Sequence, residues 1–81
     1  MLREQELEAL IVSIWQETLE KDVSSSDNFF ELGGDSLQLM SMLFRVNEEA
    51  EVELDPGLVF EDPTVLGLVR AITNLQAPKP V

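Results

Sequence analysis

Apolar residues recur at helical spacing in two separate stretches of the chain, and this pattern constrains the fold more than any other feature. The recurring apolar positions are Leu7, Leu10, Ile11 and Ile14, with Thr18 continuing their spacing, then Val65, Leu68, Val69, Ile72 and Leu75. Residues three, four and seven apart share one face of an α-helix, so each stretch predicts an amphipathic helix beside a core. The first helix is predicted from about residue 4 to 20, with Trp15 flanking its stripe at the core edge.

A long loop and a second helix are predicted after the first helix. Residues 21–35 hold turn formers without a sustained period, and a loop of this length in a small domain is often functional. We expect four apolar side chains to pin it, namely Val23, Phe29, Phe30 and Leu32. The second helix is predicted from Ser36 to about Glu49.

The remaining sequence predicts a short helix followed by a last long one. Pro56 suits the first turn of a short helix over Pro56–Phe60, and Asp62-Pro63-Thr64 stops it and caps the next helix. Gly67 inside the last helix should weaken it by up to about 1 kcal/mol. The 81 residues suffice for one domain, so we expect an all-α bundle of three longer helices and one short helix.

The second helix carries apolar residues on two nearly opposite faces. One face holds Leu39, Met42, Leu43 and Val46, and the other holds Leu37, Met40 and Phe44. A helix that covers a small bundle needs only one apolar stripe. The other face is therefore either exposed as a docking surface for a partner protein or covered by the long loop or the short helix. The spacing alone does not decide which face is buried.

The residues before this helix permit two interpretations of Ser36. Gly33 and Gly34 can adopt unusual backbone conformations and leave room for a bulky group, and Ser36 lies near a helix N-terminus, which favours an anion. A phosphate joined to its hydroxyl would have suitable surroundings, although Asp35 would repel it. Alternatively, Asp35 or Ser36 is an ordinary helix cap.

Composition excludes several classes of site and partner. The chain has no cysteine and no histidine, so it offers no thiolate nucleophile, no Ser-His-Asp triad and no thiolate metal site. No calcium loop or phosphate-binding Walker loop is present, so we expect no metal and no catalytic residue. The net charge of −11 disfavours nucleic acid and anionic membranes. The N-terminus is not a signal peptide, and we expect a cytoplasmic monomer.

Three motifs together resemble a known family. They are "DNFFELGGDSL" at 27–37, "VEL" at 52–54 and "VFEDPTV" at 59–65. With their helical context they are similar to peptidyl carrier (thiolation) domains of nonribosomal peptide synthetases, within the family of phosphopantetheine-binding carrier proteins. The resemblance implies a four-helix carrier bundle with a long loop between the first two helices. The resemblance runs from about Leu7 to Leu75, and we expect a carrier domain at 1–75. The residues at 76–81 contain two prolines and predict a flexible tail or linker.

The resemblance also implies a function. Ser36 would be the attachment point for 4′-phosphopantetheine, derived from coenzyme A and added by a phosphopantetheinyl transferase, with Gly34, Asp35 and Leu37 flanking it. The arm would carry aminoacyl or peptidyl thioesters between enzymes of antibiotic biosynthesis and secondary metabolism, and the domain itself would catalyse nothing. Leu37, Met40 and Phe44 match positions that contact partners, which leaves the other face of the second helix for the core.

The implied partners are the transferase and the adenylation, condensation, thioesterase or tailoring enzymes of the pathway. Two departures from the family stand out, because Glu51 replaces a common glycine at the end of the second helix and Asp35 replaces a common histidine. Fatty-acid carriers are also similar, but their second helix is acidic where Gln38 and Ser41 are neutral. The alternatives are an acyl carrier of a polyketide or hybrid pathway, and an unmodified helical interaction module.

Overall fold

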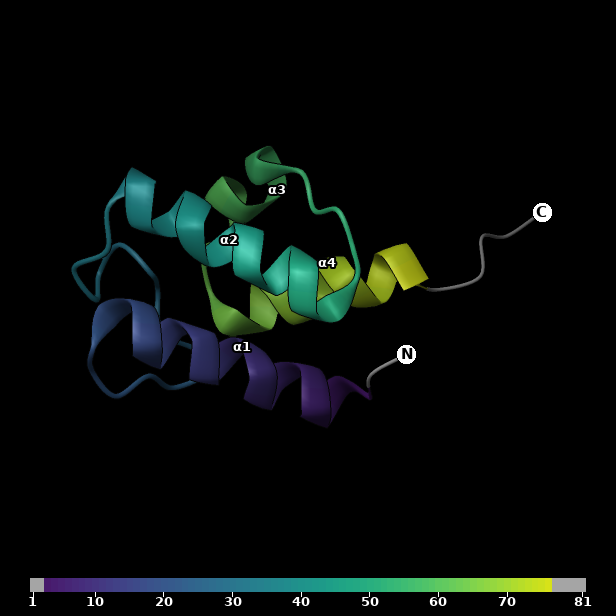
Figure 1. Ribbon diagram of the computed structural model, residues 1–81, viewed down its shortest axis with the longest axis horizontal. Coiled ribbons are helices and arrows are strands. Elements are labelled where there is room, and N and C mark those ends of the chain that lie inside the picture. Colours follow the sequence, from purple (N-terminus) through teal and green to yellow (C-terminus); the bar gives the residue numbers. More distant parts are fainter. Residues whose placement is uncertain (1–2, 77–81) are drawn as a thin grey trace.

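The computed structural model describes residues 3–76 of the protein. They form four helices, α1 (Glu4–Leu19), α2 (Ser36–Ala50), α3 (Pro56–Glu61) and α4 (Val65–Gln76). α1 lies against α2 and α4, and the short α3 packs on α4 (Figure 1). The predicted all-α bundle, its short third helix and its long first loop are confirmed. The predicted tail beyond the last helix begins at the end of α4, and its residues 77–81 lie outside the described part of the chain.

The core draws on all four helices and on the long loop. Its buried apolar side chains are Leu7, Ile11, Ile14, Trp15, Phe29, Leu39, Met42, Leu43, Val46, Leu54, Val59, Val65, Leu68, Val69 and Ile72. The expectation that Trp15 lies at the core edge is wrong, since its side chain is completely buried. The last helix also differs in one position, because Leu75 is 54% exposed and leaves the apolar stripe.

Trp15 is buried because the long loop covers it. The ring of Phe29 meets the indole edge to face, with the two ring centroids 5.0 Å apart. Backbone bonds hold this loop against the junction of α3 and α4, where the Phe29 N–H donates to Pro63 O at 2.8 Å. The Leu66 N–H likewise donates to Ser25 O at 3.1 Å. The loop is therefore part of the packed structure and positions the residues just before α2.

The two adjacent glycines of the loop close it tightly. Gly33 has a φ of 99°, which side-chain-bearing residues rarely adopt. A Cβ on Gly34 would lie 2.5 Å from Cδ2 of Phe29, so the aromatic ring fills the space that a side chain would need. The expectation that the pair leaves room for a bulky group is therefore wrong for Gly34, because its open side belongs to the core.

The junction between α3 and α4 explains the glycine inside the last helix. Thr64 caps α4 as predicted, because its Oγ1 accepts the Gly67 N–H at 2.9 Å. A Cβ on Gly67 would lie 2.5 Å from the backbone oxygen of Asp62. Glycine lowers the helical propensity here, but it allows α4 to start directly against the end of α3.

α2 ends with a residue in an unfavourable conformation. Glu51 has φ 56° and ψ 48°, and its N–H donates to the carbonyl of Asn47. This left-handed termination is normally made by glycine, since a Cβ costs about 1 kcal/mol there. Glu51, which stands where the family often has glycine, therefore adopts the left-handed conformation itself, and the cost lies in its backbone.

Replacing Glu51 by glycine is expected to stabilise the domain. The free energy of unfolding should rise by about 1 kcal/mol, which corresponds to an increase in Tm of roughly 4–8 °C for a domain of this size. Thermal unfolding followed by circular dichroism measures the change. Glu51→Ala is the matched control, because it removes the same charge and retains the Cβ. Equal gains in Tm for the two variants would contradict the backbone explanation.

Candidate functional site

The site predicted around Ser36 lies where the long loop enters α2. Asp35 is the N-cap, and its Oδ1 accepts the Gln38 N–H at 2.8 Å. The side-chain Oε1 of Gln38 in turn accepts the Asp35 N–H at 3.1 Å. This reciprocal capping box fixes the first turn of the helix. The cap is therefore Asp35, and Ser36 is the first residue of the helix proper.

Ser36 is exposed, and its hydroxyl makes no hydrogen bond within residues 3–76. In the same range the backbone N–H groups of Ser36 and Leu37 have no acceptor, whereas Gln38 and Leu39 donate to Asp35. Two free amides and the positive end of the helix dipole thus surround the hydroxyl. The Ser36 hydroxyl is available for covalent modification, and a phosphate ester on it would fit these donors.

The capping role of Asp35 also explains how an acid is accommodated next to this position. Its carboxylate oxygen Oδ1 accepts a hydrogen bond from the Gln38 N–H, and this bond stabilises the first turn of α2. The remaining amides of Ser36 and Leu37 stay free for another acceptor. Gly34, which precedes Asp35 in the chain, packs against the ring of Phe29.

The exposures along α2 decide between its two apolar faces. Leu39, Met42, Leu43 and Val46 are buried, whereas Leu37 is 83%, Met40 43% and Phe44 68% exposed. Neither the loop nor α3 covers the second face. We call Leu37, Met40 and Phe44 the docking row. It begins directly after Ser36 and follows the outer side of α2.

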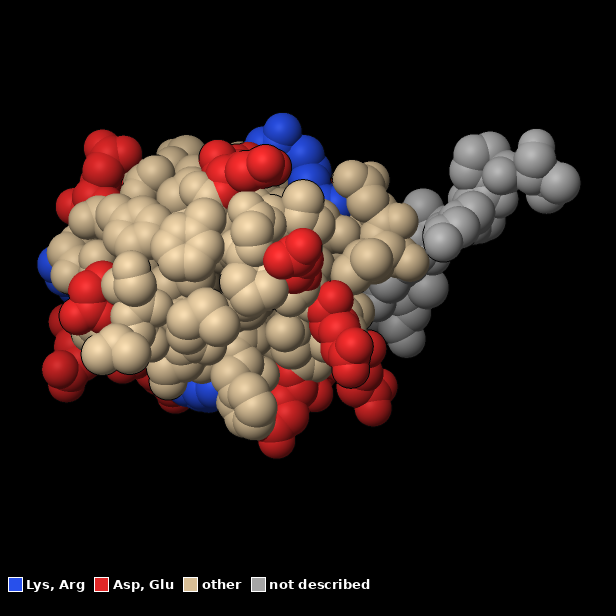
Figure 2. Space-filling model, turned by 90° about the horizontal axis from the view of Figure 1, so that it is seen from above, with Lys and Arg blue, Asp and Glu red and all other residues tan. Residues whose placement is uncertain are grey.

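Two further aromatic side chains extend the exposed apolar surface, and sequence reasoning missed them. Phe30 from the loop and Phe60 from α3 stack with their centroids 5.9 Å apart, and they are 37% and 44% exposed. Of the four side chains expected to pin the loop, Phe29 is buried in the core, and Val23 and Leu32 are partly buried against it. Phe30 holds the loop from the surface instead, through its stacking on Phe60. Figure 2 shows a broad face without charged groups, with acidic side chains around its margin.

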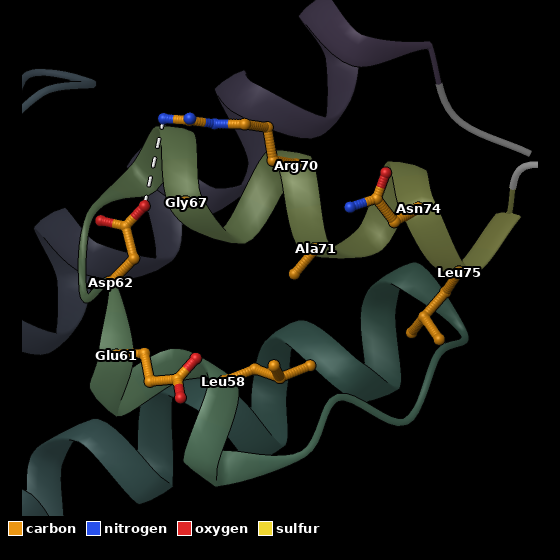
Figure 3. Close-up of a pocket in the computed structure, with 8 residues that line it drawn as sticks. All are labelled: Leu58, Glu61, Asp62, Gly67, Arg70, Ala71, Asn74 and Leu75. Atoms are coloured by element: carbon orange, nitrogen blue, oxygen red, sulfur yellow. Dashed lines mark ion pairs between the residues drawn. The ribbon is translucent and has the colours of Figure 1, made fainter.

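A separate hollow of about 310 Å³ lies between α3 and α4 (Figure 3). Leu58 and Ala71 point toward the space between the two helices, and Leu75 borders its far end. At the other end Arg70 reaches back over Gly67 to Asp62, with 4.0 Å between the charged atoms. None of the residues around Ser36 lines this hollow.

The charged groups form a few surface pairs. Arg45 bonds Glu17 of α1 at 2.7 Å and Glu49 of its own helix at 3.4 Å. The hydrogen bond that Arg45 donates to the Glu17 carboxylate raises the pKa of Arg45 above its usual value, so this side chain stays charged. Across residues 3–76, no group of acidic, histidine or cysteine side chains is arranged to hold a metal ion. None of the four helices has the length and apolar character needed to cross a membrane.

The sequence matches one family model, described as "Phosphopantetheine attachment site", over residues 9–72. Tyrocidine synthase 3 of Brevibacillus parabrevis is 43% identical over 70 residues, which are 85% of this chain and 1% of that protein. Surfactin synthase subunit 3 of Bacillus subtilis is 39% identical over 70 residues, 85% of this chain and 6% of that protein. The chain thus spans a small part of the curated relatives that it matches.

Solved structures agree with these sequence matches. A type-II acyl-carrier protein from Streptomyces verticillus involved in bleomycin biosynthesis gives a TM-score of 0.86 at 33% identity, over 93% of this chain and 92% of that one. The peptidyl carrier protein in a complex with the phosphopantetheine transferase Sfp and coenzyme A gives a TM-score of 0.79 at 30% identity. That match covers 84% of this chain and 90% of the other.

Proposed function

Because the chain belongs to the family of phosphopantetheine-bearing peptidyl carrier domains, we propose that Ser36 carries the 4′-phosphopantetheine arm. The domain then shuttles aminoacyl or peptidyl thioesters between enzymes of nonribosomal peptide biosynthesis. One observation carries the assignment to this residue. Ser36 is an exposed serine at the start of α2, and its hydroxyl makes no hydrogen bond within the described residues. In the same range the backbone N–H groups of Ser36 and Leu37, next to this hydroxyl, have no acceptor.

Each residue around Ser36 has a distinct part in this proposal. The Ser36 oxygen becomes the ester oxygen, and the N–H groups of Ser36 and Leu37 are donors for the phosphate. Asp35 and Gln38 hold the helix start in place through the capping box. When bound, the group supplies a thiol for thioester formation. This thiol would be the only one of the domain, because the chain has no cysteine.

The domain itself would supply no catalytic group, and its chemistry would be performed by partners. The first partner would be a phosphopantetheinyl transferase, as for the carrier protein in the complex with Sfp. Adenylation, condensation, thioesterase or tailoring enzymes would act after the transferase. The domain would meet them as a cytoplasmic monomer. We assign the docking row to these contacts, because exposed apolar side chains next to the attachment point are what a partner must reach.

Intact-mass spectrometry after incubation with coenzyme A and a promiscuous transferase tests this function. The mass should increase by one phosphopantetheinyl group per chain. An unmodified interaction module would keep its mass while a control carrier in the same reaction is loaded. That result would overturn the proposal.

A second candidate is an acyl carrier of a polyketide or hybrid pathway. The observation that favours it is the match to a type-II acyl-carrier protein involved in bleomycin biosynthesis. Both candidates bear the same arm on the same serine and differ in the cargo. Loading assays with adenylating enzymes for amino acids and with acyl-transfer enzymes would separate them.

Shortening the docking row is expected to weaken partner reactions more than folding. Met40→Ala and Phe44→Ala should each lower kcat/KM for loading by the transferase or for a later partner reaction by about fivefold or more, since apolar anchors dominate such interfaces. Met42→Ala is the control, because Met42 is fully buried and its loss should lower the stability by about 2–5 kcal/mol. Equal stability losses for Met40 and Met42 would show that the row belongs to the core.

A further inference from the structure

A single helical turn, residues 28–32, leads into the end of the loop that precedes Ser36. The Leu32 N–H donates to Asn28 O at 3.1 Å, which is the bonding pattern of an α-helix. The side-chain Oδ1 of Asn28 accepts two further N–H groups of the turn, that of Phe30 at 2.9 Å and that of Glu31 at 3.3 Å. The turn is therefore capped at its start in the way that a longer helix is capped.

The end of this turn is closed by the glycine pair. The Gly33 N–H donates to Phe30 O at 3.0 Å, and the Gly34 N–H donates to Phe29 O at 3.1 Å. These two bonds form a Schellman motif, in which Gly33 has the required positive φ of 99°. The motif leaves the carbonyl of Leu32 without a backbone donor within residues 3–76. A carbonyl at the end of a helical turn needs a donor from elsewhere.

Lys21, just beyond the end of α1, supplies that donor. Its Nζ donates to Leu32 O at 2.5 Å, as lysine side chains near a helix end can do. The ammonium group also lies over the glycine, since a Cβ on Gly33 would be 3.6 Å from Nζ. Lys21 forms no ion pair within residues 3–76, although the chain has 16 acidic residues. This cation therefore serves the backbone of the loop and not a carboxylate.

The peptide group between Leu32 and Gly33 is thus held at both ends. Its N–H donates to Phe30 O, and its C=O accepts from Lys21. Glycine restricts its own backbone less than any other residue, so bonds from outside have to fix the peptide at this point. Removing the lysine would leave the carbonyl to water and release one end of the peptide.

The direction of this peptide sets the path by which the chain enters α2. Only Gly34 and Asp35 separate it from Ser36. An enzyme that modifies Ser36 must bind this path in one geometry, and a path that is ordered in advance makes binding less costly. Resting on the proposed attachment of the arm to Ser36, we propose that Lys21 is a positioning residue for this modification. It acts through the Leu32 carbonyl and takes no part in the chemical step.

Lys21→Met tests this role, because it keeps an unbranched side chain and removes the donor and the charge. The KM of a phosphopantetheinyl transferase for the domain should rise about three- to tenfold, since one hydrogen bond no longer favours the competent path. The kcat should stay within about twofold, because the reacting groups are unchanged. Intact-mass spectrometry at a series of domain concentrations measures both constants.

Two matched variants separate positioning from charge. Lys21→Arg keeps a charged donor and should be loaded with the KM of the natural sequence. Arg70→Met removes one positive charge from an exposed side chain of α4, and its KM should also be unchanged. An equal rise in KM for Arg70→Met would mean that net charge steers the encounter. An equal rise for Lys21→Arg would mean that the donated bond is not what matters. Either result would overturn the proposal.

Amide hydrogen exchange in the unmodified domain gives a readout without any partner. Lys21→Met should speed exchange at the N–H groups of Gly33 and Gly34 about threefold or more, because the end of the turn opens more often. The Ile11 N–H, within α1, should exchange at its natural rate. A merely structural role would speed exchange at all three sites. Unchanged exchange at the glycines, or an equal increase at Ile11, would contradict the inference.

These outcomes are separate from the test of the carrier function. That function fails if the natural sequence accepts no phosphopantetheine. A Lys21→Met variant that is loaded with the natural KM would leave the carrier function intact and remove the positioning role of Lys21.

Discussion

Ser36→Ala is expected to abolish phosphopantetheine loading completely while leaving the fold intact. Alanine has no hydroxyl oxygen to form the ester, so no change in transferase concentration should restore the reaction. The side chain is exposed and makes no hydrogen bond within residues 3–76, so the free energy of unfolding should change by less than about 0.5 kcal/mol. Intact-mass spectrometry after incubation with coenzyme A and transferase measures the first effect, and thermal unfolding measures the second.

The control for this variant is Ser41→Ala, which removes another exposed serine hydroxyl from the same helix. It should be loaded to the same extent as the natural sequence. Loading of Ser36→Ala would place the attachment point elsewhere. Unfolding of that variant would mean that the serine has a structural role that its exposure does not reveal.

Gly34→Ala is expected to cause one of the largest losses of stability among single-methyl additions in this domain. The added Cβ would lie 2.5 Å from Cδ2 of Phe29, and that ring is fully buried against Trp15. The ring must move within a close-packed core, which costs about 2–3 kcal/mol. The Tm should therefore fall by roughly 10–20 °C. Thermal unfolding by circular dichroism, with Trp15 fluorescence as a local probe, measures the loss.

Gly57→Ala is the matched control, because its Cβ would lie 3.4 Å from the nearest atom outside its neighbours, Oδ1 of Asp55. Gly57 is in α3, where alanine has the better helical propensity, so Tm should be unchanged or slightly higher. A second check is the pair Phe29→Leu with Gly34→Ala. The smaller side chain should make the added methyl less costly. Additive losses in the double variant would contradict the proposed clash.

The helices could be predicted from the sequence because their apolar positions follow a clear period. α1 and α4 each repeat apolar residues on one face, and proline and threonine mark the boundaries around α3. The second apolar face of α2 could also be predicted from the spacing of Leu37, Met40 and Phe44, which lie opposite the residues that fill the core. Periodicity reports which residues share a face. It does not report which face is covered, and the exposures were needed for that.

The long loop could be predicted only in outline, because it has no period. Phe29 and Phe30 are adjacent and chemically alike, and only the folded path of the chain decides that one ring packs on Trp15 and the other on Phe60. The same holds for position 34, which must be glycine because the ring of Phe29, five residues earlier in the chain, fills the space of a side chain. Contacts between side chains of irregular segments are set by tertiary packing, which local sequence rules do not contain.

The most direct test of the central claim is to locate the modification in the natural sequence. The protein is incubated with coenzyme A and a phosphopantetheinyl transferase, digested, and analysed by tandem mass spectrometry. We predict one modified peptide, with the phosphopantetheinyl group on Ser36. An unmodified protein under conditions that fully load a control carrier, or a group on any other serine, would contradict the account.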